Sequence, residues 1–156
     1  MLFADAGIAL GQHANVFISV LDEPATMERM REVRKCVERA SKLWPNASCG
    51  LTIIGAGAQA LSVSKGIREE SAAITRDFPG AGNTIIVEGT GFSGSAMRAF
   101  MSGIFIVTRN RGRIHGTVDE GAAWLAPIAS AVSKVQLSPA ALVSAAAEVR
   151  RALRPI

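Results

Sequence analysis

Residues 53–60, IIGAGAQA, are one of two segments whose residue types and spacing could do chemistry. They match the GxGxxA form of the dinucleotide-binding fingerprint through Gly55, Gly57 and Ala60. In that fingerprint the glycines let the backbone approach a pyrophosphate at the start of a helix, and an acidic residue bonds a ribose hydroxyl. Glu88, at the end of the next apolar run, could supply the acid. Nucleotide binding is thus one hypothesis.

The same residues also have a simpler explanation. Glu88 follows Gly57 at a distance wider than the ~20 residues that the fingerprint expects. A hairpin and a helix are predicted ahead of the first strand of such a site, and few strands remain after Glu88 to complete a dinucleotide fold. Since a short Gly-Ala loop between a strand and a helix explains the segment, nucleotide binding is kept as an alternative.

The second segment is TGFSGS, residues 90–95, directly before a helical pattern. Exposed N–H groups at a helix start attract anions, and Gly91 and Gly94 let the backbone approach closely. Together with Ser93 and Ser95, these glycines predict a site for phosphate or another small ligand. The simpler interpretation is that Ser93 or Ser95 caps the helix.

His13 and His115 are the only histidines in the chain. Neither has a second Cys, His or carboxylate beside it at metal-ligand spacing, so no metal site is predicted. No Ser or Cys stands in a nucleophile-elbow context. We therefore expect no catalytic residues and no cofactor, and we expect both histidines at surface or turn positions.

Arg109, Arg111 and Arg113 form a basic turn. Such a turn could contact the phosphates of a nucleic acid or a lipid head group, although a solvated loop is the commoner role. The net charge of +4 is small for 156 residues, and no aromatic residue is interleaved with the basic clusters. Nucleic acid is therefore not an expected partner.

The composition is that of a globular protein, with 49% hydrophobic and 19% charged residues. The length fits one domain. Apolar runs fall short of the ~20 residues that a spanning helix needs, and the first residues lack the basic flank of an export signal. Cys36 and Cys49 are expected to be reduced thiols. Together these features predict a cytoplasmic protein without a membrane span.

Hydrophobic periodicity predicts alternating strands and helices. Apolar runs predict strands at residues 6–10, 16–21, 51–54, 84–87 and 113–118, of which the first two form a hairpin. Apolar spacings of three and four predict helices at residues 27–44, 63–78, from 93 or 95 to about 104, from 119 onward, and 138–153. Asp119 and Ser138 are expected to cap the last two helices.

The order of these elements predicts the fold class. Strands separated by helices imply right-handed crossovers and a parallel sheet. We predict a single α/β domain with a mixed, mostly parallel β-sheet, an N-terminal hairpin, helices, and a C-terminal helical extension.

The predicted order resembles that of the STAS and anti-sigma-factor-antagonist-like family. TIIVEGTGFSGSAMRAF, residues 84–100, is similar to the family's strand, serine-containing loop and helix start. GTVDEGAAWLA, residues 116–126, is similar to the last strand and helix of a STAS-like subgroup. The resemblance covers residues 6–128. It implies a STAS-like domain at residues 1–128, with residues 129–156 as a helical extension of the same domain.

The serine loop departs from the family's pattern. In regulatory members a serine at the start of the third helix accepts phosphate, a role that the resemblance transfers by position to Ser93 or Ser95. The family's motif has an acidic residue directly before paired serines and a glycine, whereas here Phe92 precedes Ser93, Gly94 and Ser95. This difference argues against phosphorylation.

Three functions follow from these patterns. The leading hypothesis is a non-enzymatic STAS-like regulatory or protein-interaction module, as a homodimer or with another protein, that senses an anion or small ligand at residues 89–95. A nucleotide-binding protein or enzyme that uses residues 55–60 is the first alternative. The second is binding of a lipid or other apolar ligand near Met97, Phe100 and Met101, because STAS-like folds resemble lipid-carrier domains. A solid core beneath the third helix would exclude that alternative.

Overall fold

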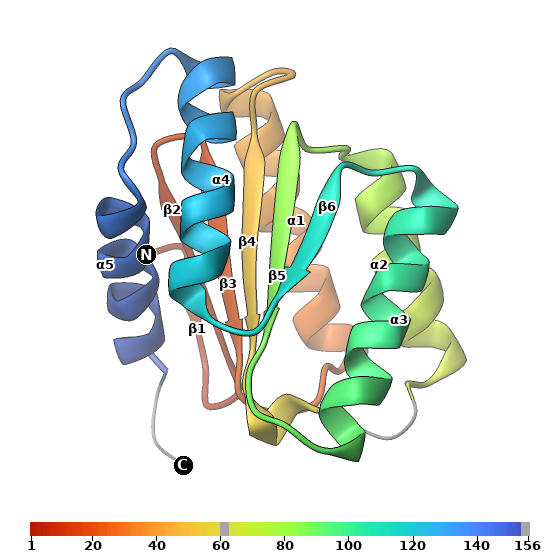
Figure 1. Ribbon diagram of the computed structural model, residues 1–156. Coiled ribbons are helices and arrows are strands. Elements are labelled where there is room, and N and C mark those ends of the chain that lie inside the picture. The colour runs from red at the N-terminus through yellow and green to blue at the C-terminus, as the bar shows by residue number, and fades with distance from the viewer. Residues whose placement is uncertain (60–62, 154–156) are drawn as a thin grey trace.

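The computed structural model describes residues 1–59 and 63–153 and contains a mixed sheet (Figure 1). Its strands are β1 (Phe3–Ala4), β2 (Ile8–His13), β3 (Val16–Leu21), β4 (Cys49–Ile54), β5 (Gly82–Val87) and β6 (Gly112–His115), in that order across the sheet. The pairs β1–β2 and β2–β3 are antiparallel, and β3 through β6 pair in parallel. The prediction of a mostly parallel sheet with an N-terminal hairpin is confirmed.

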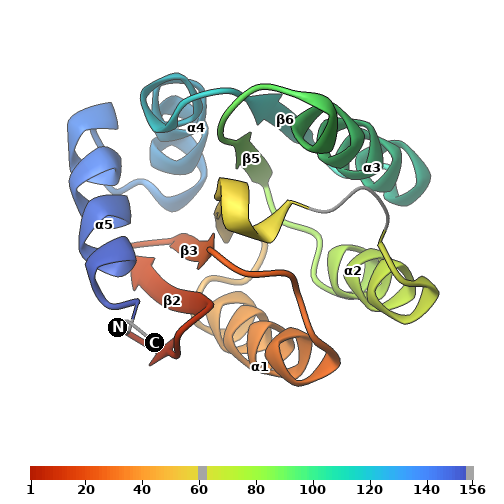
Figure 2. The ribbon, with the colours of Figure 1, turned by 90° about the horizontal axis from the view of Figure 1, so that it is seen from below.

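Helices cover both faces of the sheet (Figure 2). On one face lie α1 (Met27–Leu43), α2 (Lys65–Asp77) and α3 (Phe92–Thr108), each of which connects two parallel strands. On the other face lie α4 (Val118–Ser133) and α5 (Pro139–Arg151), which pack on each other and on β2 through β6. Because consecutive right-handed crossovers proceed in one direction, the three crossover helices share one face.

The differences from the predicted boundaries have local causes. The sequence analysis does not predict β1, a two-residue strand that pairs Phe3 with Leu10. The prediction that Asp119 caps α4 is wrong, because Thr117 is the N-cap and accepts a hydrogen bond from Glu120 N at 3.2 Å. The last strand therefore ends at His115, ahead of this cap, and not at residue 118.

The face covered by α4 and α5 has a closely packed core. Alternate residues of β3, Val16, Ile18 and Val20, are fully buried there among side chains of both helices. α4 continues through residue 128 to Ser133, and α5 begins at its predicted cap, Ser138. α5 packs on β2 and β3 of its own chain.

The other face is packed differently at its centre. α1 lies on β2 and β3, and α3 lies on β5 and β6, whereas α2 packs mainly against α1 and α3. Figure 2, which views the molecule from below, shows α2 standing apart from the sheet between its two neighbours. α2 thus stands off the part of the sheet that lies beneath it.

Candidate functional site

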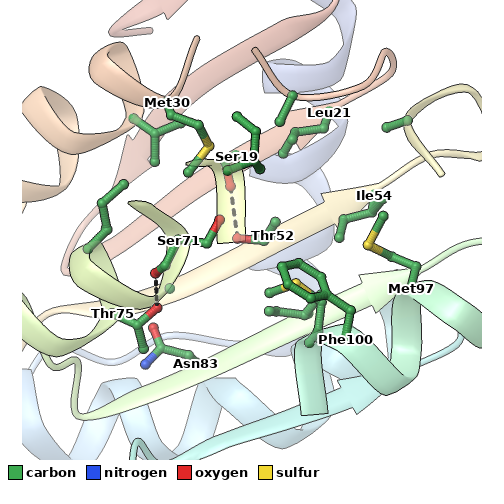
Figure 3. Close-up of a pocket in the computed structure, with 18 of the residues that line it drawn as sticks. Ser19, Leu21, Met30, Thr52, Ile54, Ser71, Thr75, Asn83, Met97 and Phe100 are labelled. Carbon is green, nitrogen blue, oxygen red and sulfur yellow. Dashed lines mark hydrogen bonds between the residues drawn. The ribbon is translucent and has the colours of Figure 1, made fainter. Parts of the chain in front are cut away.

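A cavity of about 330 Å³ lies between α2 and the sheet (Figure 3). This volume lies within the range of about 300–1,000 Å³ typical of ligand pockets. Its floor consists of side chains that point toward this face from three parallel strands, paired in rows by the strand register. The rows are Phe17–Gly50–Asn83, Ser19–Thr52–Ile85 and, at the carboxyl ends of the strands, Leu21–Ile54.

The walls and roof come from the three crossover helices. Apolar side chains contribute most of this surface: Met30, Val33 and Val37 from α1, Ile67, Ile74 and Phe78 from α2, and Met97, Phe100, Met101 and Phe105 from α3. α2 also contributes Ser71 and Thr75, since positions 67, 71, 74, 75 and 78 share one helical face. The cavity is therefore a mainly apolar site with a few hydroxyl and amide groups.

The described lining contains no charged residue, no histidine and no cysteine. A charge buried in such a site without a partner costs several kcal/mol or more. The lining also offers no general acid or base to activate the serine and threonine hydroxyls. The chemistry of these residues suits binding of an uncharged apolar molecule.

A hydroxyl pair lies at the centre of the floor. Ser19 Oγ and Thr52 Oγ1, on neighbouring strands, form a hydrogen bond at 2.8 Å. Ser71 lines the cavity from α2, and its carbonyl oxygen accepts a hydrogen bond from Thr75 Oγ1 at 2.9 Å (Figure 3). Hydrogen-bonding groups thus line both the floor and the roof.

Two amide side chains form the polar end of the cavity. Asn83 Nδ2 donates to Asn110 Oδ1 at 2.6 Å, and Asn110 Nδ2 donates to the carbonyl oxygen of Thr75 at 3.3 Å. This series of hydrogen bonds links β5, the turn after α3, and α2. Gly50 makes room for it, because a Cβ atom at this position would lie 2.5 Å from Asn83 Oδ1.

Arg34 connects α1 to α2 beside the cavity. Its Nε and Nη1 bond Glu70 at 2.7 Å and Asp77 at 3.0 Å, and its guanidinium lies over the ring of Phe78. The hydrogen bond to Glu70, followed by that to Asp77, raises the pKa of Arg34. These contacts hold α2 against α1 without requiring contact between α2 and the sheet.

The structure explains the Gly55 loop by backbone packing. Cβ atoms at Gly55 and Gly57 would collide with Asp22, at its carboxylate and its carbonyl oxygen respectively. The prediction that this loop opens a helix is wrong, because the loop itself contains a short 3₁₀ turn, η1 (Ala56–Ala58), and α2 begins only at Lys65. Ala60 lies outside the described residues. At both glycines the side that a Cβ atom would occupy is taken by Asp22.

Glu88 also has a partner within the chain. Its Oε1 accepts a hydrogen bond from Arg150 Nη2 of α5 at 2.8 Å, and its side chain is partly exposed. The ion pair ties the end of β5 to the helix pair on the opposite face from α2. Nothing in this arrangement favours a ribose at Glu88, and the nucleotide hypothesis gains no support from the geometry.

The serine loop caps its helix differently from the prediction. Gly91 is the N-cap of α3, at φ +112°, and makes no side-chain cap hydrogen bond. The expectation that Ser93 or Ser95 is the cap is therefore wrong: both lie within the first turn, Ser93 half-buried and Ser95 exposed. Anion binding at this loop stays a prediction.

The structure brings the two glycine-containing loops together. Gln59 Nε2 donates to the carbonyl oxygen of Glu88, and a Cβ at Gly94 would lie 3.2 Å from Gln59 Oε1. Arg98 Nη2 donates to the carbonyl oxygens of Val87 and Gly89 at 3.1 and 2.7 Å. Gln59 and Arg98 thus donate hydrogen bonds to the carbonyl groups at and after the carboxyl end of β5.

No histidine or cysteine is part of the described cavity lining, although His115 bonds Thr84, which is. His13 ends β2, and His115 Nδ1 lies 2.8 Å from Thr84 Oγ1 and packs near Trp124. Burial, with the nearby Arg113, lowers the pKa of His115. Both cysteines are free; Cys49 is buried, and burial raises its pKa to about 11. Such a thiol is a poor nucleophile.

The sequence predicts some of the residues that line this cavity. It placed an apolar-ligand site near Met97, Phe100 and Met101, and the structure has a cavity beside these residues. It missed Ser19, Thr52, Asn83 and the amide of Asn110. A signal existed, because single polar residues interrupt the apolar strands VFISVL and CGLTII at positions that share one face.

Two kinds of feature are absent from the described part of the chain. No group of three or more His, Cys, Asp or Glu side chains there could hold a metal ion. None of its helices has the length and apolar character needed to cross a membrane.

Comparisons with family models, curated proteins and solved structures find no match to this chain. The STAS-like resemblance therefore stays a prediction.

Proposed function

We propose that this protein binds an uncharged, mainly apolar small molecule in the cavity between α2 and the sheet. The observation that carries the proposal is the lining, which is apolar with a few hydroxyl and amide groups and lacks charged side chains among the described residues. At roughly 30 Å³ per heavy atom, the volume that a water molecule takes in the liquid, the cavity holds about ten such atoms. We take the protein to be a cytoplasmic binding module.

The experiment is calorimetric titration with 1-octanol and with octanoate. We expect 1-octanol to bind with 1:1 stoichiometry and to raise the melting temperature, because a ligand that binds only the folded state stabilises it. Octanoate should bind at least tenfold more weakly, since its carboxylate would have no cationic partner in the cavity. Equal binding of the two ligands, or binding of neither, would overturn the proposal.

A pair of leucine variants locates the binding. Ser71→Leu fills the cavity from α2 and should weaken octanol binding at least tenfold without loss of stability. Arg68→Leu introduces the same side chain at an exposed position one turn earlier and should leave binding unchanged. If Ser71→Leu also leaves it unchanged, the ligand binds elsewhere.

A second candidate function is a regulatory homodimer formed through the outer face of α3. Phe92, Ile106 and Val107 are 79%, 77% and 74% exposed. Arg98 is the one charged residue of α3 and bonds backbone carbonyls of the preceding segment. A two-fold interface places the same surface on both partners, so a nearly uncharged helix face can meet its own copy without like-charge repulsion.

Light scattering across a concentration series tests the dimer. We expect a mass near twice that of the chain for the wild type and a monomer for Ile106→Glu. Ser144→Glu, at an exposed position of α5, is the control and should stay dimeric. A monomeric wild type at all concentrations would remove this candidate.

A further inference from the structure

The polar end of the cavity includes an amide oxygen that has no hydrogen-bond donor among the described residues. Asn83 Oδ1 accepts no hydrogen bond from the described residues, and it is not among the buried atoms that lack a partner, so it keeps accessible surface. It lies over Gly50, which lines the same cavity. The oxygen is therefore available to a molecule inside the cavity.

The orientation of this amide is determined by a backbone group. The carbonyl oxygen of Thr75 can only accept, so Asn110 must turn its NH₂ group toward Thr75 and its Oδ1 toward Asn83. Asn83 must then present its own NH₂ group to Asn110 Oδ1, at 2.6 Å. Both amides are thus fixed, and rotation of Asn83 to present a donor to the cavity would place two oxygens together.

The opposite end of the cavity has no amide side chain among the described residues, and the Ser64 hydroxyl there already accepts a hydrogen bond from Ile67 N at 3.4 Å. Leu21 and Ile54 form the floor at the carboxyl ends of the strands, and Met30, Ile67 and Met97 surround them. An acceptor at one end and apolar surface at the other define a direction for an elongated ligand. The absence of charged groups in the described lining excludes an ammonium as the donor, because it would be a buried charge without a partner.

We propose that the ligand is an apolar chain with a neutral hydrogen-bond donor, a hydroxyl or an amide N–H, at one end, and that Asn83 Oδ1 accepts that donor. The inference depends on the proposed binding function and adds the ligand's chemical class and direction. The apolar chain extends along the strands toward Leu21 and Ile54.

The test compares two isomers, 1-octanol and 1-methoxyheptane. They have the same atoms and nearly the same apolar surface, but only the alcohol donates a hydrogen bond. We expect the alcohol to bind about tenfold more tightly to the wild-type protein, a difference of about 1.4 kcal/mol. Equal affinities would overturn this inference and leave the proposed function intact, whereas binding of neither isomer would overturn both.

Two variants assign the difference to Asn83. Asn83→Leu keeps the size of the side chain and removes the acceptor, so the alcohol should lose its advantage while the ether keeps its affinity. Gly50→Ala leaves Asn83 in the sequence but displaces its amide from the floor, and it should also reduce the ratio toward one. If the folded variants retain the tenfold preference, a different group recognises the donor and the inference is wrong.

Discussion

Asn83 Nδ2 lies 2.6 Å from Asn110 Oδ1, and this hydrogen bond joins β5 to the turn that follows α3. Because Asn110 also bonds the carbonyl oxygen of Thr75, the same link reaches α2. Arg34 holds the other side of α2 to α1. α2 is thus bonded to α1 on one side and to the turn after α3 on the other. These bonds explain how the helix can stand above the sheet and leave a cavity beneath it.

The Gly55 loop yields a prediction that separates packing from ligand binding. In Gly57→Ala the new Cβ would meet the carbonyl oxygen of Asp22, which belongs to the backbone and cannot turn away. We expect a loss of at least about 2 kcal/mol in the free energy of unfolding in the absence of any ligand, measured by urea denaturation.

The matched control is another glycine-to-alanine change. A Cβ at Gly103, within α3, would meet nothing within 4 Å. Gly103→Ala should therefore stabilise the protein by about 0.5–1 kcal/mol, the helix-propensity difference. If Gly57→Ala is as stable as the wild type, the glycine is not required for packing and a ligand role at this loop returns.

Asn15 supports the hairpin from inside the core. It is 1% exposed, and its Nδ2 donates to the carbonyl oxygens of Ala47 at 2.7 Å and Ala129 at 3.1 Å. Asn15→Ala would leave both carbonyl groups without this donor, so we expect a loss of about 2 kcal/mol in the free energy of unfolding. A loss below about 0.5 kcal/mol in chemical denaturation would contradict this role.

The buried thiol of Cys49 makes the free energy of unfolding depend on pH in the alkaline range. Burial raises the pKa of its thiol from the ordinary value of 9.0 to about 11, so the folded state favours the protonated form. This contribution is fully present below pH 9 and is lost as the pH rises from 9 to 11. The free energy of unfolding should fall by about 2 kcal/mol over that interval.

The variant Cys49→Ala separates the thiol from other groups. The chain has no tyrosine, so fewer side chains titrate in this range than in most proteins. Unfolding curves of the variant, measured from pH 8 to pH 11, should decline less steeply than those of the wild type. Parallel declines would show that Cys49 ionises equally easily in the folded and unfolded states.

The sequence predicts the fold well because its apolar patterns are long and regular. The strand VFISVL and the helix from Met27 to Leu43 both appear where their periodicity places them. The N-caps are harder to predict. Thr117, not Asp119, caps α4, and Gly91, not Ser93 or Ser95, caps α3. Several small polar residues stand near each helix start, and the tertiary path of the entering chain decides among them.

The cavity could be predicted only in part. Met97, Phe100 and Met101 indicated an apolar surface on α3, but periodicity cannot show whether the facing elements fill the space against it. That outcome depends on α2, which packs on α1 and α3 above the sheet. The alignment of Asn83 with Gly50 depends on strand register, which the sequence of either strand alone does not specify.

The most direct test of the account is a crystal structure grown with 8-bromo-1-octanol, in which the anomalous signal of bromine marks the end of the chain. We predict one bromine peak beside Leu21, Ile54 and Met97, with the hydroxyl group within hydrogen-bond distance of Asn83 Oδ1. Bromine at the Asn83 end would contradict the proposed direction. An empty cavity in crystals that hold the compound elsewhere would contradict the central claim that this site binds an apolar ligand.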